Sequence, residues 1–241
     1  MNPLSREDFI ELGVSISSDT LVRWATGQLA ATKGKEARLA ARGVTEDSLN
    51  NLRDLAALVE KRGKELGDPG DLPPQPVALA QRLREEAVDY RQEAKLMAKV
   101  EFGTRPDLLA KFRTGVQTGL LLANLAKEIE STVSHLREHA AQLAGLGAIE
   151  SFIARGAALA GKLTHAKAEL DTACRALPAA ALQHCHDKGL LYDLTRKLVR
   201  TGRLVFVHDP EHASRFNFTE VRRKRGESTQ ARLKQEEASG R

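Results

Sequence analysis

Apolar residues recur at helical spacing along most of the chain, and the pattern predicts four long helices. The first covers residues 45–66, where leucine, alanine and valine lie three or four positions apart. Residues 67–76 follow, and their prolines and glycines predict a loop because they remove backbone donors and break regular structure. The second helix then runs to about Phe102, and its apolar positions form a heptad stripe. The stripe consists of Ala80, Leu83, Ala87, Tyr90, Ala94 and Met97.

The second half of the chain continues the same period. After a turn at Gly103, residues 106–145 read as one helix of about forty residues, and the glycines at 145 and 147 end it. The fourth helix covers residues 148–177 and stops at Pro178. Because four amphipathic helices with short connections bury their apolar faces against one another, we predict an all-α fold, an elongated antiparallel helical bundle.

Shorter helices are expected to flank this bundle. Residues 1–43 predict short helices that pack on the bundle, and residues 44–177 form its core. Residues 178–221 predict two short helices separated at Gly189, and residues 222–241 form a basic tail. The segment 203–221 fits either a helical continuation or a β-hairpin, and we prefer the helix.

Composition narrows the class of protein. With 41% hydrophobic and 29% charged residues in 241, the chain is expected to fold as a globular protein. Aromatic residues make up only 4%, which disfavours a base-stacking platform for single-stranded nucleic acid. We find no signal peptide and no membrane span. Cys174 and Cys185 lack a CxxC spacing, so we expect buried reduced thiols and a cytoplasmic location.

Positive charge is concentrated at the C-terminal end. Residues 188–241 hold 13 Lys and Arg against 7 Asp and Glu, whereas residues 1–187 hold 24 against 25. Such a region is typical of contact with an acidic protein surface or with phosphates. The candidate contact residues are Arg196, Arg200, Arg203, Arg222, Arg223, Lys224 and Arg225.

One short motif could carry chemistry. His135, Glu138 and His139 form an HxxEH string, and this five-residue pattern resembles the inverted-motif zinc peptidases. The resemblance implies that both imidazoles bind zinc and that Glu138 activates a water molecule. A third ligand is not indicated by any pattern, although Glu169, Asp171 and Glu211 are available. We therefore interpret the string as polar residues beside the core, and we predict no catalytic residue, metal or cofactor.

Other motifs give no stronger signal. Residues 184–187 (HCHD) supply four metal-binding side chains, but neighbours on a helix point in different directions. We find no ExxH pair, phosphate-binding loop or nucleophile elbow. The expected function is a non-enzymatic structural or interaction protein that forms a homo-oligomer or binds a protein partner. The alternatives are a nucleic-acid-associated protein that binds phosphates through the basic region, and a zinc-dependent enzyme that uses the HxxEH string.

Overall fold

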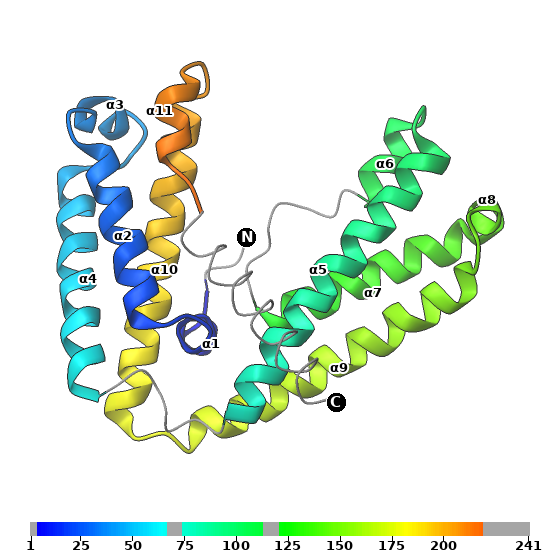
Figure 1. The fold of residues 1–241 in the computed structure, drawn as a ribbon, viewed down its shortest axis with the longest axis horizontal. Coiled ribbons are helices and arrows are strands. Elements are labelled where there is room, and N and C mark those ends of the chain that lie inside the picture. Colours follow the sequence, from blue (N-terminus) through cyan, green and yellow to red (C-terminus); the bar gives the residue numbers. More distant parts are fainter. Residues whose placement is uncertain (1–3, 67–73, 113–120, 219–241) are drawn as a thin grey trace, which may run out of the picture. The chain divides into compact units, whose positions relative to one another are not determined.

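The computed structural model describes residues 4–66, 74–112 and 121–218, and every regular element among these residues is a helix, with no strand (Figure 1). The predicted all-α class is confirmed. Short connections and capped helix starts account for the breaks, as at Ser5, whose side chain accepts a hydrogen bond from the Asp8 amide. The elements are α1 (Arg6–Val14), α2 (Ser18–Thr32), α3 (Glu36–Ala40), α4 (Glu46–Leu66), α5 (Pro74–Phe102), α6 (Pro106–Phe112), α7 (Leu122–Glu138), α8 (Ala140–Leu143), the 3-10 turn η1 (Ala144–Leu146), α9 (Ile149–Arg175), α10 (Ala179–Val205) and α11 (Pro210–Arg215).

The helices divide into two compact units. Unit 1 comprises residues 1–69 and 178–241, and unit 2 comprises residues 70–177. This division differs from the predicted boundaries, which grouped residues 44–177 into one bundle. The difference arises at α4, which packs on α2 and α10 in unit 1. Its apolar stripe is therefore buried against the flanking helices, and the long helices are shared between two cores.

Unit 1 is built around α10, which contacts α1, α2, α3, α4 and α11. Helix α10 runs without a break through Gly189, so the predicted division into two short helices is wrong. The glycine serves a close helix crossing instead. A Cβ atom on Gly189 would lie 1.9 Å from the carbonyl oxygen of Phe9 on α1, and one on Gly13 would lie 1.8 Å from that of Cys185. Only hydrogen atoms fit between the two backbones.

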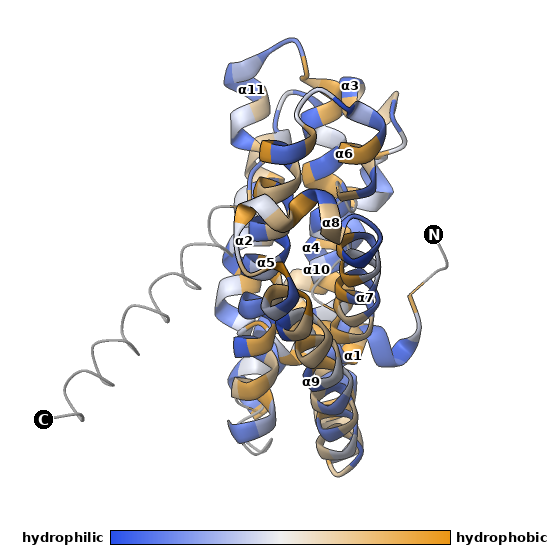
Figure 2. Ribbon diagram, turned by 90° about the vertical axis from the view of Figure 1, so that its right-hand side faces the viewer, coloured by the Kyte–Doolittle hydropathy of each residue, from blue (hydrophilic) through white to orange (hydrophobic). Residues whose placement is uncertain are grey.

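Unit 2 packs α5, α7 and α9 against one another. Its centre holds an aromatic pair, Tyr90 and Phe152, whose rings stack with centroids 4.4 Å apart. Gly156 makes room for this pair, because a Cβ atom there would lie 2.1 Å from the Tyr90 hydroxyl oxygen. Figure 2 shows that apolar and polar residues alternate along these helices, as expected of amphipathic segments.

The predicted forty-residue helix is present in separate pieces. Helix α6 ends at Phe112, residues 113–120 lie outside the described residues, and α7 ends at Glu138. His139 leaves the helical conformation, with φ −113° and ψ 16°, before α8 begins. The predicted loop at 67–76 also lies mostly outside the described residues, and α5 begins inside it at Pro74, where a first-turn proline is tolerated.

The helical interpretation of the C-terminal piece is confirmed for the described residues up to Phe218. Helix α10 extends to Val205, and α11 begins after Asp209, whose side chain accepts a hydrogen bond from the His212 amide at 3.2 Å. Both cysteines are buried, as expected. No single described helix is long and apolar enough to cross a bilayer. The segments Ala140–Leu146 and Ile149–Arg175 have the required length and composition only when taken together, and they meet at a bend of 111°.

Candidate functional site

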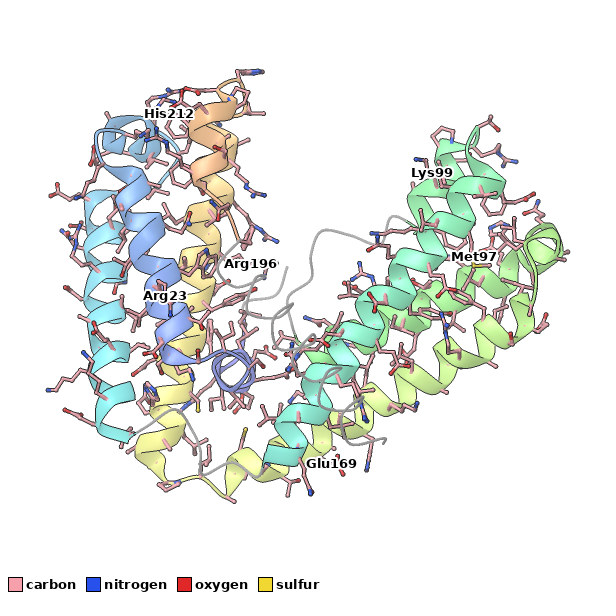
Figure 3. The ribbon with its side chains drawn as sticks, in the orientation of Figure 1. Arg23, Met97, Lys99, Glu169, Arg196 and His212 are labelled. Carbon is pink, nitrogen blue, oxygen red and sulfur yellow. The ribbon has the colours of Figure 1, made fainter. Side chains whose placement is uncertain are left out.

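Three of the predicted contact residues, Arg196, Arg200 and Arg203, lie on consecutive turns of α10. Arg196 and Arg200 are four residues apart, and each is partly exposed. Figure 3 labels Arg196 together with Arg23, an exposed arginine of α2, the helix that packs beside α10 in unit 1. Lys197 forms an ion pair with Asp193 at 2.8 Å and so contributes little net charge.

The guanidinium of Arg200 is partly buried and lies near a second positive charge. Burial lowers the pKa of its guanidinium, and the positive charge of Arg196 lowers this pKa further, against opposing effects of Tyr192 and Asp193. Two like charges one helical turn apart repel each other. An anion that contacts both arginines would relieve that repulsion, which makes this pair a suitable anchor for an acidic partner.

Arg203, unlike Arg196 and Arg200, makes contacts within unit 1 that are structural. Its Nε atom donates a hydrogen bond of 2.6 Å to the carbonyl oxygen of Phe216, and its guanidinium lies 5.4 Å from the centre of the Phe218 ring. The Nε1 atom of Trp24 donates a hydrogen bond of 2.8 Å to the carbonyl oxygen of Asn217. Arg203 therefore holds the segment after α11 against the helices of unit 1, a structural role that sequence analysis missed.

The sequence did contain a signal for this attachment. Trp24 is the only tryptophan in the chain and is buried, with its ring near those of Tyr192 and Phe218, 5.6 and 5.5 Å away. A buried tryptophan needs an acceptor for its N–H group, and here the acceptor is backbone from the far end of the chain. The basic run Arg222–Arg225 lies outside the described residues and follows Phe218 by only four positions.

The HxxEH string lies at the C-terminal end of α7. Its carboxylate is occupied: Glu138 Oε1 accepts a hydrogen bond from Lys111 Nζ at 2.8 Å. This contact lowers the pKa of Glu138, with smaller contributions from the two neighbouring histidines. The carboxylate lies 3.6 Å from His135 Nδ1 and 3.7 Å from His139 Nε2, so it faces both imidazoles.

The two histidines are packed on aromatic rings. Their ring centres lie 5.9 and 6.4 Å from that of Phe112, and His139 Nδ1 is 2.9 Å from Gln142 Oε1. No third ligand joins them, since no group of three metal-binding side chains occurs among the residues that the structure describes. The available carboxylates have other partners: Glu169 with His165 at 3.3 Å, Asp171 with Lys167 at 2.5 Å, and Glu211 with Arg215 at 3.0 Å.

Residues 184–187 diverge, as expected of neighbours on a helix. His184 Nε2 lies 3.1 Å from Ser18 Oγ, and Asp187 forms an ion pair with Arg62 of α4. The serine–histidine pair is of a type that can catalyse acyl transfer. Here both side chains are buried, and Gly63 of α4 lies directly over Ser18, where an added Cβ would be 2.9 Å from the Ser18 Cβ. The contact ties α2 to α10.

Comparisons with known proteins give no relative: no family model, no curated protein and no solved structure matches this chain. The candidate site therefore consists of what the structure itself places together. It comprises the Arg196–Arg200 pair on α10 and, further along the same helix, Arg203 with its contacts to Phe216 and Phe218.

Proposed function

We propose that the protein is a non-enzymatic helical interaction protein whose basic C-terminal region binds an acidic surface of a protein partner, while its helical body self-associates or docks a partner. One observation supports the first part: Arg196 and Arg200 lie one helical turn apart on α10, and both are partly exposed. The run Arg222–Arg225 adds four positive charges to the same end of the sequence. A cytoplasmic location is part of this proposal, and the burial of both cysteines is in keeping with it.

Exposed charges of this kind mainly raise the rate at which two partners associate. Exposed ion pairs contribute about 0.2–1 kcal/mol each, and complementary charge raises association rates more than it strengthens the final complex. Six arginine and lysine side chains in concert would therefore give an interaction that weakens steadily with salt.

The test measures binding of labelled poly-L-glutamate to the full chain by fluorescence anisotropy. One variant replaces Arg196 and Arg200 with Ser, and a second replaces residues 222–225 with Ser. Each is expected to weaken binding at least about tenfold, which is about 1.4 kcal/mol. The matched control is Lys61→Ser with Lys64→Ser, two exposed lysines of α4 whose loss should leave binding unchanged. Equal binding by all variants would contradict the proposal.

Nucleic acid is the second candidate, favoured by the uninterrupted basic run at 222–225. Binding to phosphates releases counterions, so affinity for duplex DNA would fall by several orders of magnitude between low and moderate salt. The same variants, tested against a mixed-sequence duplex, separate the two candidates. Protein purified without nuclease should show absorbance dominated at 280 nm if the partner is a protein, and excess absorbance at 260 nm, lost in high salt, if it is nucleic acid.

A further inference from the structure

The chain leaves α11 through a short segment, residues 216–218, that is held in the manner of a bound peptide. Helix α11 turns back along α10 and leads into it (Figure 1). Phe216 has an extended backbone, with φ −88° and ψ 91°, and its carbonyl oxygen accepts a hydrogen bond of 2.6 Å from Arg203 Nε. The carbonyl oxygen of Asn217 accepts one of 2.8 Å from Trp24 Nε1. Side chains from two helices, α10 and α2, thus bond two consecutive carbonyl groups of the segment.

The two phenylalanine side chains of the segment are bound as well. Phe216 is fully buried, and its ring stacks on that of Phe206 with the centroids 5.8 Å apart. Gly202 makes room for Phe216, because a Cβ atom there would lie 2.3 Å from its ring. The ring of Phe218 lies 5.5 Å from that of Trp24. Hydrogen bonds to the backbone, combined with separate places for alternate side chains, are how proteins recognise extended peptides. We call the residues that receive the segment, Trp24, Gly202, Arg203 and Phe206, the aromatic seat.

The segment can leave this seat without the unfolding of a helix. Helix α11 connects it to α10, and none of the residues of α11 is buried. In the turn between the two helices Val207 and His208 are exposed. The seat itself belongs to α2 and α10, which pack on each other and are also joined by the contact of Ser18 with His184 at 3.1 Å. Rotation at the turn would therefore carry α11 and the segment away and leave the seat assembled.

We propose that two copies of this chain associate by exchanging residues 216–218, so that the segment of one copy occupies the aromatic seat of the other. The occupant follows from the fit of the seat to a Phe-Asn-Phe segment, because a second copy presents the identical segment. Reciprocal exchange closes with two-fold symmetry and makes again, between copies, the contacts that opening breaks. The inference rests on the self-association part of the proposed function and gives it a location.

Competition within each chain sets the concentration at which exchange occurs. A segment on the same chain competes for the seat at an effective concentration of about 1 mM. The wild-type chain should therefore be monomeric when dilute, and its dimer fraction should grow as its concentration approaches about 1 mM. A chain without a usable seat of its own and a chain without a segment of its own lack this competition, so they should associate at lower concentration.

The first experiment mixes two such full-length variants. Phe216→Ala/Phe218→Ala keeps the seat and loses the segment, whereas Gly202→Leu keeps the segment and fills the seat. Trp24→Phe is added to the second variant, so that only the first contains tryptophan. Titration of the second into the first should move the emission of Trp24 to shorter wavelength, toward that of the wild-type chain, and should saturate. Light scattering should then give twice 26.4 kDa. Misfolded variants could not restore each other in this way.

The matched control for the second variant is Gly27→Leu/Trp24→Phe. It places the same leucine on α2 where no heavy atom lies within 4 Å of the added Cβ. Its segment still has a seat on its own chain, so it should bind the first variant at least about tenfold more weakly. The proposal is overturned if the seat-filled variant leaves the emission of Trp24 unchanged, or if it binds no more tightly than this control.

A second measurement separates a second copy from other occupants. A synthetic peptide with the sequence of residues 214–220, SRFNFTE, is titrated into Phe216→Ala/Phe218→Ala, and the mass of the wild-type chain is measured at about 1 mM. We expect the peptide to saturate the seat and the wild-type chain to form a dimer that this variant does not form. Saturation by the peptide with a wild-type monomer would overturn exchange between copies and indicate a segment of another protein as the occupant. A dimer that persists in the variant would also contradict the proposal.

Binding of poly-L-glutamate distinguishes failure of this proposal from failure of the proposed function. Arg196, Arg200 and the run at 222–225 are unchanged in all of these variants. Each variant should therefore bind poly-L-glutamate as the wild-type chain does, whether or not the segments exchange.

Discussion

Single side chains set the most specific features of this molecule. Trp24 and Arg203 fix the end of the described chain by bonding its backbone carbonyls, and Tyr90 fixes the centre of unit 2. The hydroxyl group of Tyr90 donates a hydrogen bond of 3.3 Å to the carbonyl oxygen of Phe152. Each of these contacts joins residues more than ten positions apart, and each satisfies a polar group that folding removes from water.

Because of Tyr90, the free energy of unfolding should decrease with pH in the alkaline range. Burial, more than any nearby charge, raises its pKa from 10 to about 12. The folded state therefore retains the phenolic proton more firmly than the unfolded state. The resulting stabilisation is fully present below about pH 10 and is lost between about pH 10 and 12, by at most about 1.4 kcal/mol per pH unit.

Urea unfolding between about pH 8 and about pH 11.5 measures this loss. The control is Tyr90→Phe, which forfeits one hydrogen bond, about 0.5–1.5 kcal/mol, but cannot ionise. The gap between the two proteins should narrow as pH rises through 10. A gap that stays constant would show that Tyr90 does not titrate differently on unfolding.

At the scale of elements, apolar periodicity predicted which segments are helical but not which helices meet. The heptad stripe of α5 is buried up to Ala94, and then Ala98 is buried in place of Met97. A straight helix drifts from a strict seven-residue repeat in this way. Which helices pack together depends on three-dimensional fit, such as the close approach of α1 and α10 at Gly13 and Gly189. In a sequence a glycine can equally indicate a helix end, so this contact could not be predicted.

The candidate site was predictable to a similar degree. Arg196 and Arg200 share one side of α10, as their spacing indicates. The task of Arg203 was not predictable, because its acceptor lies beyond a turn and a second helix. Likewise, HxxEH spacing gave no information about Lys111, which comes from α6 and occupies the glutamate. Sequence spacing reports on neighbours within one helix only.

The crossing of α1 and α10 should be intolerant of any side chain. Gly189→Ala places a methyl group 1.9 Å from the carbonyl oxygen of Phe9, so the helices must separate, at a cost of about 2–4 kcal/mol. Gly27→Ala is the matched control, because no heavy atom lies within 4 Å of its added Cβ on α2. There the greater helix propensity of alanine should stabilise by about 0.5–1 kcal/mol. Chemical denaturation gives the free energy of unfolding of both variants. Destabilisation of Gly189→Ala alone would show that the close backbone contact requires glycine at this position.

On the scale of the whole molecule, the two units differ in whether one or two segments of the chain form them. Unit 2 is one continuous segment, residues 70–177, whereas unit 1 is assembled from the two ends of the chain. We expect residues 70–177 alone to be helical and to unfold cooperatively, since α5, α7 and α9 pack on one another.

Residues 1–177 provide the matching comparison. This fragment contains α1, α2 and α4 without α10, the helix on which all three pack. Circular dichroism and thermal unfolding should show for it no more cooperative structure than for residues 70–177 alone. Added cooperative structure in the longer fragment would mean that the N-terminal helices form a core without α10.

The divided origin of unit 1 has a consequence for synthesis of the protein in a cell. Helices α1 to α4 are complete at Leu66, yet α10, which covers their apolar faces, ends at Val205. At about 5–20 residues per second, a ribosome needs roughly 7 to 28 s to add the residues between these points. During that time α2 and α4 can pack only on each other, without α10 to cover the rest of their apolar faces, while unit 2 can already fold. The nascent chain thus presents its first third to chaperones for longer than its middle.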